Sequence, residues 1–191
     1  MRIVPLAIDG VFAIEVDRFS DDRGFFARTF DVDEFAALGL SSTVVQGSVA
    51  HNHTAGTVRG MHWQAEPALE AKLVRCTRGA VLDQIVDLRP GSPTRLRSVA
   101  VELTEDNLTT LYVPPLFAHG YQTLADATEV TYLMDAPHQP DAARGLRFDD
   151  PALGLHWPLP VSVIADKDLR WPLLDTQPPG PPGSGIRPEE S

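Results

Sequence analysis

The sequence predicts an all-β domain, folded as a sandwich or a barrel. Two observations indicate this class. Short segments rich in β-branched residues follow one another along the chain, and turn sequences such as "RGA", "RPGSPT" and "TEDN" separate them. This alternation of short strands and turns is typical of β-sandwiches and barrels. With 191 residues, the chain is long enough for one domain to bury a core.

The strands are expected where valine, isoleucine and threonine cluster between these turns. The segment "GTVRGMHWQ" (56–64) begins at a glycine and alternates small or apolar residues with polar ones. The segment 71–89 has two apolar halves on either side of the turn at Gly79. The expected strands are 11–19, 42–50, 56–64, 71–89, 97–104, 110–115 and 127–134.

One helix is expected, over "DVDEFAALGL" (31–40). Asp31 can cap its first turn, and Glu34 occupies the capping-box position. Gly39 can end the helix in a left-handed conformation.

The last part of the chain has a different composition. From Thr176 it runs "TQPPGPPGSGIRPEES", with too little apolar surface to offset the entropy lost on ordering. We therefore expect one domain over 1–175 and a disordered tail over 176–191.

Charge and cysteine content limit the partners and the compartment. The net charge of −10 argues against nucleic acids and anionic membranes, although local arginines can still bind a small anion. Cys76 is the single cysteine, so no internal disulfide can form. Pro5 and Asp9 interrupt the N-terminal apolar run, so we expect neither a signal peptide nor a membrane span. Together these features predict a cytoplasmic protein.

Polar residues on the expected strands allow a metal site as one interpretation. Small cupin-type barrels often bind a metal through a His-x-His pair, a glutamate and a late histidine. Here His119 supplies the late histidine, but Gln64 follows His62 where a second histidine would stand, and Lys72 would repel a metal. The "HNH" stretch (51–53) could be a displaced pair, although a solvated loop explains it more simply. We therefore expect no metal.

Two histidine–carboxylate pairs support a metal-free interpretation. His62 is a potential base near neutral pH, and Asp168 could orient it and stabilise its charged form. Asp83 could do the same for His119. The alternative for both carboxylates is a turn cap or a solvated surface group.

Two further residues complete a set suited to proton abstraction next to a carbonyl. Lys72 could stabilise an enolate oxygen, and Tyr132 could protonate the other face of a planar intermediate. Lys72 could equally be a surface lysine with a buried stem, and Tyr132 a strand aromatic with its hydroxyl in water.

The order of several motifs identifies the chain as resembling a known family. They are "DDRGFFARTF", "VRGMHWQ", "AKLVRCTRGAVLDQIVDLRPGSPT", "VELTEDN", "LYVPPLFAHGYQTL", "TYLMD", "ARGLRFDDPALGLHWPLP" and "ADKDLRWP". In this order they resemble the dTDP-4-dehydrorhamnose 3,5-epimerase family over roughly residues 1–175, an enzyme family of deoxysugar nucleotide biosynthesis. The resemblance implies a cupin-type jelly-roll core, a homodimer with strand exchange, and no metal or other cofactor. It also implies a substrate with a sugar 4-ketone linked to a nucleoside diphosphate.

The same resemblance implies roles for individual residues. It matches His62 to the catalytic base, Asp168 to its partner carboxylate, Lys72 to the residue beside the ketone oxygen and Tyr132 to the acid. It matches the remaining positions to substrate contacts: His119 and Asp83 in the pocket, Arg23 and Arg59 at the diphosphate, and Gln46 and Phe26 near the nucleotide.

Three departures from the family pattern fall on expected nucleotide or substrate contacts. Arg28 stands where the family commonly has glutamate, and His138 where it commonly has tyrosine. The usual "Q-x-N-x-S" is "QGSVA" here. The proton-transfer residues are unchanged, so the departures leave the nucleotide open: dTDP is favoured and CDP is an alternative. They also leave open inversion at C3, at C5 or at both.

Other functions of the same fold remain alternatives. A 3,4-ketoisomerase would use the same enolate chemistry, a sugar-nucleotide-binding protein would have none, and a cupin oxygenase would need the metal.

One geometric question concerns Arg59 and His62. They are three residues apart, so a regular strand would point them to opposite faces. Either a bulge near Gly60 realigns them, or Arg59 serves the pocket of a partner subunit.

Overall fold

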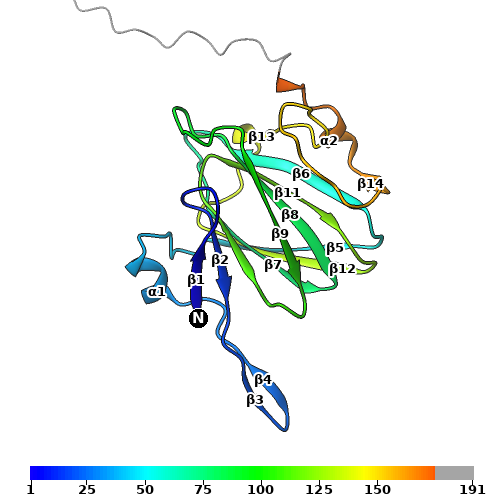
Figure 1. Ribbon diagram of the computed structural model, residues 1–191. Coiled ribbons are helices and arrows are strands. Elements are labelled where there is room, and N and C mark those ends of the chain that lie inside the picture. The colour runs from blue at the N-terminus through cyan, green and yellow to red at the C-terminus, as the bar shows by residue number, and fades with distance from the viewer. Residues whose placement is uncertain (175–191) are drawn as a thin grey trace, which may run out of the picture.

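The computed structural model describes residues 1–174, which form a sandwich of two antiparallel sheets (Figure 1). The first sheet has the strand order β1-β2-β10-β7-β12-β5. Its strands are β1 (Arg2–Pro5), β2 (Phe12–Glu15), β5 (Gln46–Asn52), β7 (Lys72–Arg78), β10 (Thr110–Val113) and β12 (Thr128–Met134).

The second sheet has the order β13-β6-β11-β8-β9, and β14 pairs with β6 in parallel. Its strands are β6 (Thr57–Gln64), β8 (Ala80–Asp87), β9 (Ser98–Thr104), β11 (Phe117–Thr123), β13 (Ala143–Gly145) and β14 (Val163–Ile164). Because β13 and β14 pair with different parts of β6, they bring the last part of the described chain, from residue 143 onward, alongside this strand.

The apolar core lies between the two sheets. Buried Val74, Leu111 and Val130 come from the first sheet and pack with Val81 and Ile85 of the second. Burial alternates along β9 and the first half of β12, as in strands that bury one face, whereas β10 and β11 are buried at every position. The all-β, cupin-type sandwich predicted from the sequence is confirmed.

The described helices are short. They are α1 (Val32–Ala37), the 3-10 helix η1 (Pro140–Ala142) and α2 (Asp166–Leu169). The predicted caps of α1 are present, since Asp31 accepts hydrogen bonds from the N–H groups of Asp33 and Glu34, and Gly39 has a φ of +68°. Within residues 1–174 no helix is long and apolar enough to cross a membrane.

The strand predictions are confirmed in position more than in number or extent. Each predicted range contains strand residues, but 11–19 breaks after Glu15 and 42–50 begins only at Gln46. β11 was missed, because it follows a proline pair, contains His119 and Gly120 and is buried at every position, so it lacks the alternation of a half-exposed strand. The tail expected over 176–191 lies outside the described residues.

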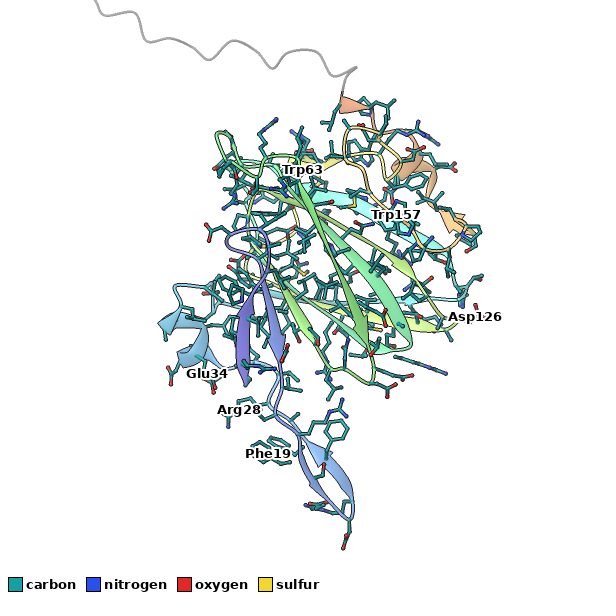
Figure 2. The ribbon with its side chains drawn as sticks, in the orientation of Figure 1. Phe19, Arg28, Glu34, Trp63, Asp126 and Trp157 are labelled. Atoms are coloured by element: carbon teal, nitrogen blue, oxygen red, sulfur yellow. The ribbon has the colours of Figure 1, made fainter. Side chains whose placement is uncertain are left out.

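A hairpin of β3 (Phe19–Asp21) and β4 (Gly24–Phe26) projects from the body of the sandwich (Figure 1). It exposes Phe19, Phe25 and Phe26, which are 66%, 52% and 67% accessible. Figure 2 shows Phe19 and Arg28 at the opposite end of the molecule from Trp63. Because Trp63 adjoins His62 in β6, the hairpin lies far from the polar residues of that strand.

Candidate active site

A cleft between the two sheets holds most of the polar residues that the sequence singles out. One cavity has a volume of about 450 Å³ and a second, next to it, about 560 Å³. Both are lined by Ser48, His62, Lys72, Tyr132 and Lys167. The first also contains Arg59, His119 and Asp168. We call the two cavities together the intersheet cleft.

His62 and Asp168 form a hydrogen-bonded pair in this cleft. His62 Nε2 lies 2.6 Å from Asp168 Oδ1, with the carboxylate buried and the imidazole partly exposed. Burial alone would raise the pKa of Asp168, but the hydrogen bond with His62, its positive charge when protonated and the Gly60 N–H together hold that pKa below its usual value. An ionised Asp168 keeps a hydrogen on Nε2, which leaves Nδ1 to take up a proton.

The C-terminal segment positions Asp168 over β6. Val163 and Ile164 of β14 pair with the start of β6, and α2 follows directly after them. Asp168 is the buried residue of α2 and also accepts a weak hydrogen bond of 3.4 Å from the N–H of Gly60. Hydrogen bonds with the Gly60 N–H of β6 and with His62 therefore hold the Asp168 carboxylate in place.

A bulge in β6 brings Arg59 and His62 to the same cleft. β11 pairs His119 with His62 and Tyr121 with Arg59, so two steps along β11 match three along β6. Gly60 lies within the bulge with a φ of +131°, and a Cβ there would come within 2.5 Å of the β11 backbone. The predicted bulge near Gly60 is confirmed, and Arg59 lines the cleft of its own chain.

A second pair, His119 and Asp83, lies deeper beside the first. His119 Nε2 is 2.8 Å from Asp83 Oδ2, and both side chains are buried. Burial raises the pKa of Asp83, and His119 opposes this shift. The His119 ring also packs edge-to-face on Tyr132, with 6.2 Å between ring centroids. The expected contact between His119 and Asp83 is therefore present, and it connects the floor of the cleft to the opposite sheet.

Lys72 and Tyr132 face the His62–Asp168 pair from the opposite sheet. Lys72 begins β7 and Tyr132 lies on β12, whereas His62 lies on β6 of the other sheet. The strand register pairs Tyr132 with Val74, two residues beyond Lys72, so both polar side chains share the inner face. A planar group held in the cleft would thus have the imidazole on one side and the phenol on the other.

Burial changes the acidity of both groups. It lowers the pKa of Lys72 to about 8, against the attraction of Asp135. An ion pair with Glu70 also favours the ammonium form of Lys72. Burial raises the pKa of Tyr132 well above its usual value, so the phenol keeps its proton at neutral pH. The first sheet therefore contributes a cation and a protonated phenol.

Gln64, which stands where a metal site would have a histidine, has a structural role. Its Nε2 donates to the carbonyls of Ala68 and Pro137 at 3.0 and 3.3 Å, and its Oε1 accepts from the N–H of Gln139 at 2.6 Å. The buried side chain therefore joins β6 to two loops.

In the "HNH" stretch, His51 and His53 are exposed, whereas Asn52 between them is buried. The rings of His51 and His53 pack edge-to-face with centroids 5.0 Å apart. The expectation of a loop was wrong for His51, which lies in β5 because its backbone pairs with Glu129 of β12. In the described part of the chain, no group of three or more histidine, cysteine, aspartate or glutamate side chains is placed to hold a metal ion.

Comparison with known proteins assigns this architecture to a family. The family profile described as dTDP-4-dehydrorhamnose 3,5-epimerase matches residues 5–176. The chain belongs to the dTDP-4-dehydrorhamnose 3,5-epimerase family. It is an epimerase of deoxysugar nucleotide biosynthesis, and its ligand is a nucleotide sugar.

Relatives with the family's name match nearly the whole chain. A dTDP-4-dehydrorhamnose 3,5-epimerase of Sinorhizobium fredii is 41% identical over 175 residues, covering 91% of this chain and 90% of the relative. The crystal structure of the Elizabethkingia anophelis enzyme has a TM-score of 0.88 and 31% identity, covering 92% of this chain and 97% of that one. The Bacillus anthracis enzyme, solved with TDP and PPi bound, has a TM-score of 0.87 and 36% identity, covering 91% and 99%.

The structure of this epimerase divides the expected nucleotide contacts into two groups. Gln46 and His138 line the second cavity, where Gln46 Oε1 accepts a 2.8 Å hydrogen bond from the His138 N–H. Arg23, Phe26 and Arg28 lie outside the intersheet cleft, on or beside the hairpin. Arg23 pairs with Asp21, and Arg28 lies 2.6 Å from the helix cap Asp31.

Two residues that line the cleft of this epimerase were not predicted from the sequence, Lys167 and Tyr121. Lys167 lines both cavities, and Tyr121 lines the first. Ser48, which belongs to the "QGSVA" motif of expected contacts, also lines both cavities. Lys167 directly precedes Asp168, so the candidate carboxylate could have indicated it. For Tyr121, in an unrecognised strand, no pattern in the sequence indicated a place in the site.

Proposed function

We propose that this epimerase inverts C3, C5 or both in a nucleoside-diphosphate 4-keto-6-deoxy sugar, with His62 as the base and Tyr132 as the acid. His62, paired with Asp168, removes the proton from a carbon next to the ketone. Lys72 stabilises the enolate oxygen, and Tyr132 delivers a proton to the opposite face of the carbon. No metal or other cofactor takes part in this proposal.

The placement of base and acid on opposing sheets carries the proposal. Inversion requires a proton to leave one face of a carbon and another to arrive on the other face. His62 projects from β6 of one sheet and Tyr132 from β12 of the other, with the cleft between them. A hydrogen next to a ketone is too weakly acidic for an imidazole unless the enolate is stabilised, and the buried Lys72 ammonium supplies that stabilisation.

Local charge supports a diphosphate-linked substrate despite the net charge of −10. Arg59, Lys72 and Lys167 all line the first cavity, and the one acidic side chain lining it, Asp168, is paired with His62. The relative with TDP and PPi bound favours thymidine as the base, so we propose dTDP, with CDP as the alternative.

Turnover in deuterium oxide tests this function. Proton NMR of a dTDP-linked 4-keto-6-deoxy sugar is expected to show exchange and inversion at C3 or C5. Migration of the carbonyl to C3 would indicate a 3,4-ketoisomerase instead, and neither exchange nor conversion would indicate a binding protein.

The affinities for different nucleotides should separate the contribution of the base to binding from that of the diphosphate. Calorimetric titration with dTDP, CDP, UDP and GDP is expected to give the tightest binding for dTDP. Arg59→Ala should weaken all four by a similar factor of about 10 to 100, because it removes a charged donor to phosphate. Arg97→Ala, an exposed arginine outside the cleft, is the control. Equal binding of all four by the wild type would contradict base selection, and tighter CDP would change the assigned nucleotide.

The pH dependence of the activity should show whether the Lys72 ammonium is required. Its pKa is lowered to about 8, so the cation is present below that pH and is lost as the pH rises through it. Activity that depends on the ammonium should therefore fall on the alkaline side. Lys72→Arg should move this fall to higher pH, because a guanidinium stays charged, and Lys72→Met should lose most activity at every pH. An unchanged alkaline limb in Lys72→Arg would contradict the role.

We also propose a homodimer in which the hairpin completes the site of the partner. Arg23 and Phe26 are exposed at the hairpin, and it lies away from the cleft of its own chain (Figures 1 and 2). Exposed Val49 and Leu133 add apolar surface on the first sheet. A second copy would bury these side chains and bring an arginine to the diphosphate.

Subunit mixing tests this dimer. The Arg23→Ala variant and the His62→Asn variant should each have low activity. When the two are mixed and their subunits exchange, activity should recover, because one site of the heterodimer has both residues intact. Mixing His62→Asn with Asp168→Asn should recover none, since those two residues meet within one chain. Absence of recovery in the first mixture, or a monomer in solution, would contradict the proposal.

A further inference from the structure

A buried amide and a buried phenol link the candidate acid to the candidate phosphate-binding arginine. Asn52 ends β5 in the first sheet, and Tyr121 lies on β11 in the second. The two residues are 3% and 1% accessible. Asn52 Nδ2 donates to the Tyr121 hydroxyl oxygen at 3.2 Å, and that hydroxyl is 3.4 Å from Asn52 Oδ1. The contact joins the two sheets beside the cleft.

Each member of this pair also touches a residue of the proposed site. Arg59 Nε donates to Asn52 Oδ1 at 2.8 Å, and Arg59 Nη2 donates to the His51 carbonyl at 3.4 Å. On the other side, Tyr121 and Tyr132 both line the first cavity, and the Tyr121 hydroxyl adds to the effect of burial in raising the pKa of Tyr132. One chain of polar contacts therefore runs from Arg59 through Asn52 and Tyr121 to Tyr132.

The Tyr121 hydroxyl has two possible acceptors for its hydrogen bond. It has one hydrogen, which can point to Asn52 Oδ1 or to the oxygen of Tyr132. While Tyr132 is a neutral phenol, Asn52 can accept that hydrogen. After Tyr132 gives up its proton, its oxygen is a buried anion, and an anion without a donor is costly in such a site. Asn52 Nδ2 can continue to donate to Tyr121 in either state.

We propose that Asn52 and Tyr121 are positioning residues for the epimerisation, in which Tyr121 turns its hydroxyl hydrogen to the phenolate formed on Tyr132 while Asn52 holds Arg59 at the diphosphate. The inference rests on the proposed roles of Tyr132 and Arg59. The Tyr132 O–H bond breaks, its proton joins the electron pair of the carbanion in a new C–H bond, and the O–H electrons remain on Tyr132. Solvent later returns a proton to that oxygen. Tyr121 keeps its own proton throughout.

Tyr121→Phe tests the link to the acid, because it removes one hydroxyl and keeps the ring in the core. Inversion should fall by about 10- to 100-fold, the effect expected for losing a hydrogen bond to a charged oxygen. Deuterium exchange at the reacting carbon and dTDP affinity should stay near wild type, because His62 and the Asn52–Arg59 contact are intact. Tyr112→Phe, which removes a phenol hydroxyl buried in another cluster, is the matched control and should change neither quantity.

A double variant distinguishes action through Tyr132 from a general loss of packing. If Tyr121 acts through Tyr132, then Tyr121→Phe combined with Tyr132→Phe should invert no more slowly than Tyr132→Phe alone. Multiplied losses in the double variant would overturn the proposal. So would a wild-type ratio of inversion to exchange in Tyr121→Phe, or an equal effect of Tyr112→Phe.

Asn52→Leu tests the shared role of the amide, and it should both weaken dTDP binding and lower the ratio of inversion to exchange. If this variant folds and changes only one of the two, Asn52 does not couple them, and the proposal is wrong. Should it fail to fold, the Tyr121 variants still decide the link to the acid. Wild-type inversion by Tyr132→Phe would disprove the assigned acid itself, whereas loss in Tyr132→Phe with no loss in Tyr121→Phe would disprove only this inference.

Discussion

His62→Asn is expected to abolish both epimerisation and solvent exchange at the reacting carbon, with a loss of about 10²–10⁴-fold. No other group in the proposal removes the substrate proton, so without the imidazole the enolate does not form. Asparagine keeps a polar side chain of similar reach but cannot take up a proton. Rates of turnover and of deuterium incorporation, measured in the same sample by proton NMR, check the prediction.

Two further variants test whether the loss of activity in His62→Asn is specific to this imidazole. Asp168→Asn should retain part of the activity, because the imidazole remains but loses the carboxylate 2.6 Å away that stabilises its charged form. His53→Asn removes an exposed imidazole outside the cleft and should behave as wild type. Unimpaired exchange in His62→Asn, with dTDP binding intact, would show that another group is the base.

Tyr132→Phe is expected to separate inversion from exchange. Inversion should fall by about 10²–10⁴-fold, because the acid on the opposite face is gone. Exchange should continue, since His62 can still remove a proton and return a deuteron to the same face. The unperturbed pKa of a phenol is about 10, so Tyr132 is a poor base at neutral pH but a suitable donor to a carbanion. Tyr112→Phe again serves as the control for loss of a buried phenol hydroxyl. Equal loss of exchange and inversion in Tyr132→Phe would assign it a part in forming the enolate instead.

The proton-transfer residues of the site were predicted from the sequence better than the strands that surround them. His62 and Asp168 are separated by 106 positions, yet they are in contact. Their chemical types allowed a base paired with a carboxylate, and the resemblance to the family matched the two residues to those roles. The bulge between Arg59 and His62 was also predictable, since a spacing of three conflicts with a strand period of two and Gly60 offers the needed backbone freedom.

Other features depend on tertiary packing that no local pattern encodes. β11 is buried on both faces, so its residues do not alternate, and the place of Tyr121 in the cleft was not predicted. β14 has two residues and is defined only by pairing with β6, although it positions Asp168. The hairpin that carries Arg23 was missed, because its strands have three residues each and are exposed at every position, so they show no apolar–polar alternation.

The central claim, that two different groups act on the two faces of the carbon, is tested most directly by a single turnover of the wild-type enzyme in deuterium oxide. With His62 removing the substrate proton and a solvent-exchanged Tyr132 supplying the new one, the product should contain solvent deuterium at every inverted carbon from the first turnover. If the inverted carbon instead retains the original hydrogen of the substrate, one group has carried the same proton from face to face, and the assignment of His62 and Tyr132 as a base and acid pair is wrong.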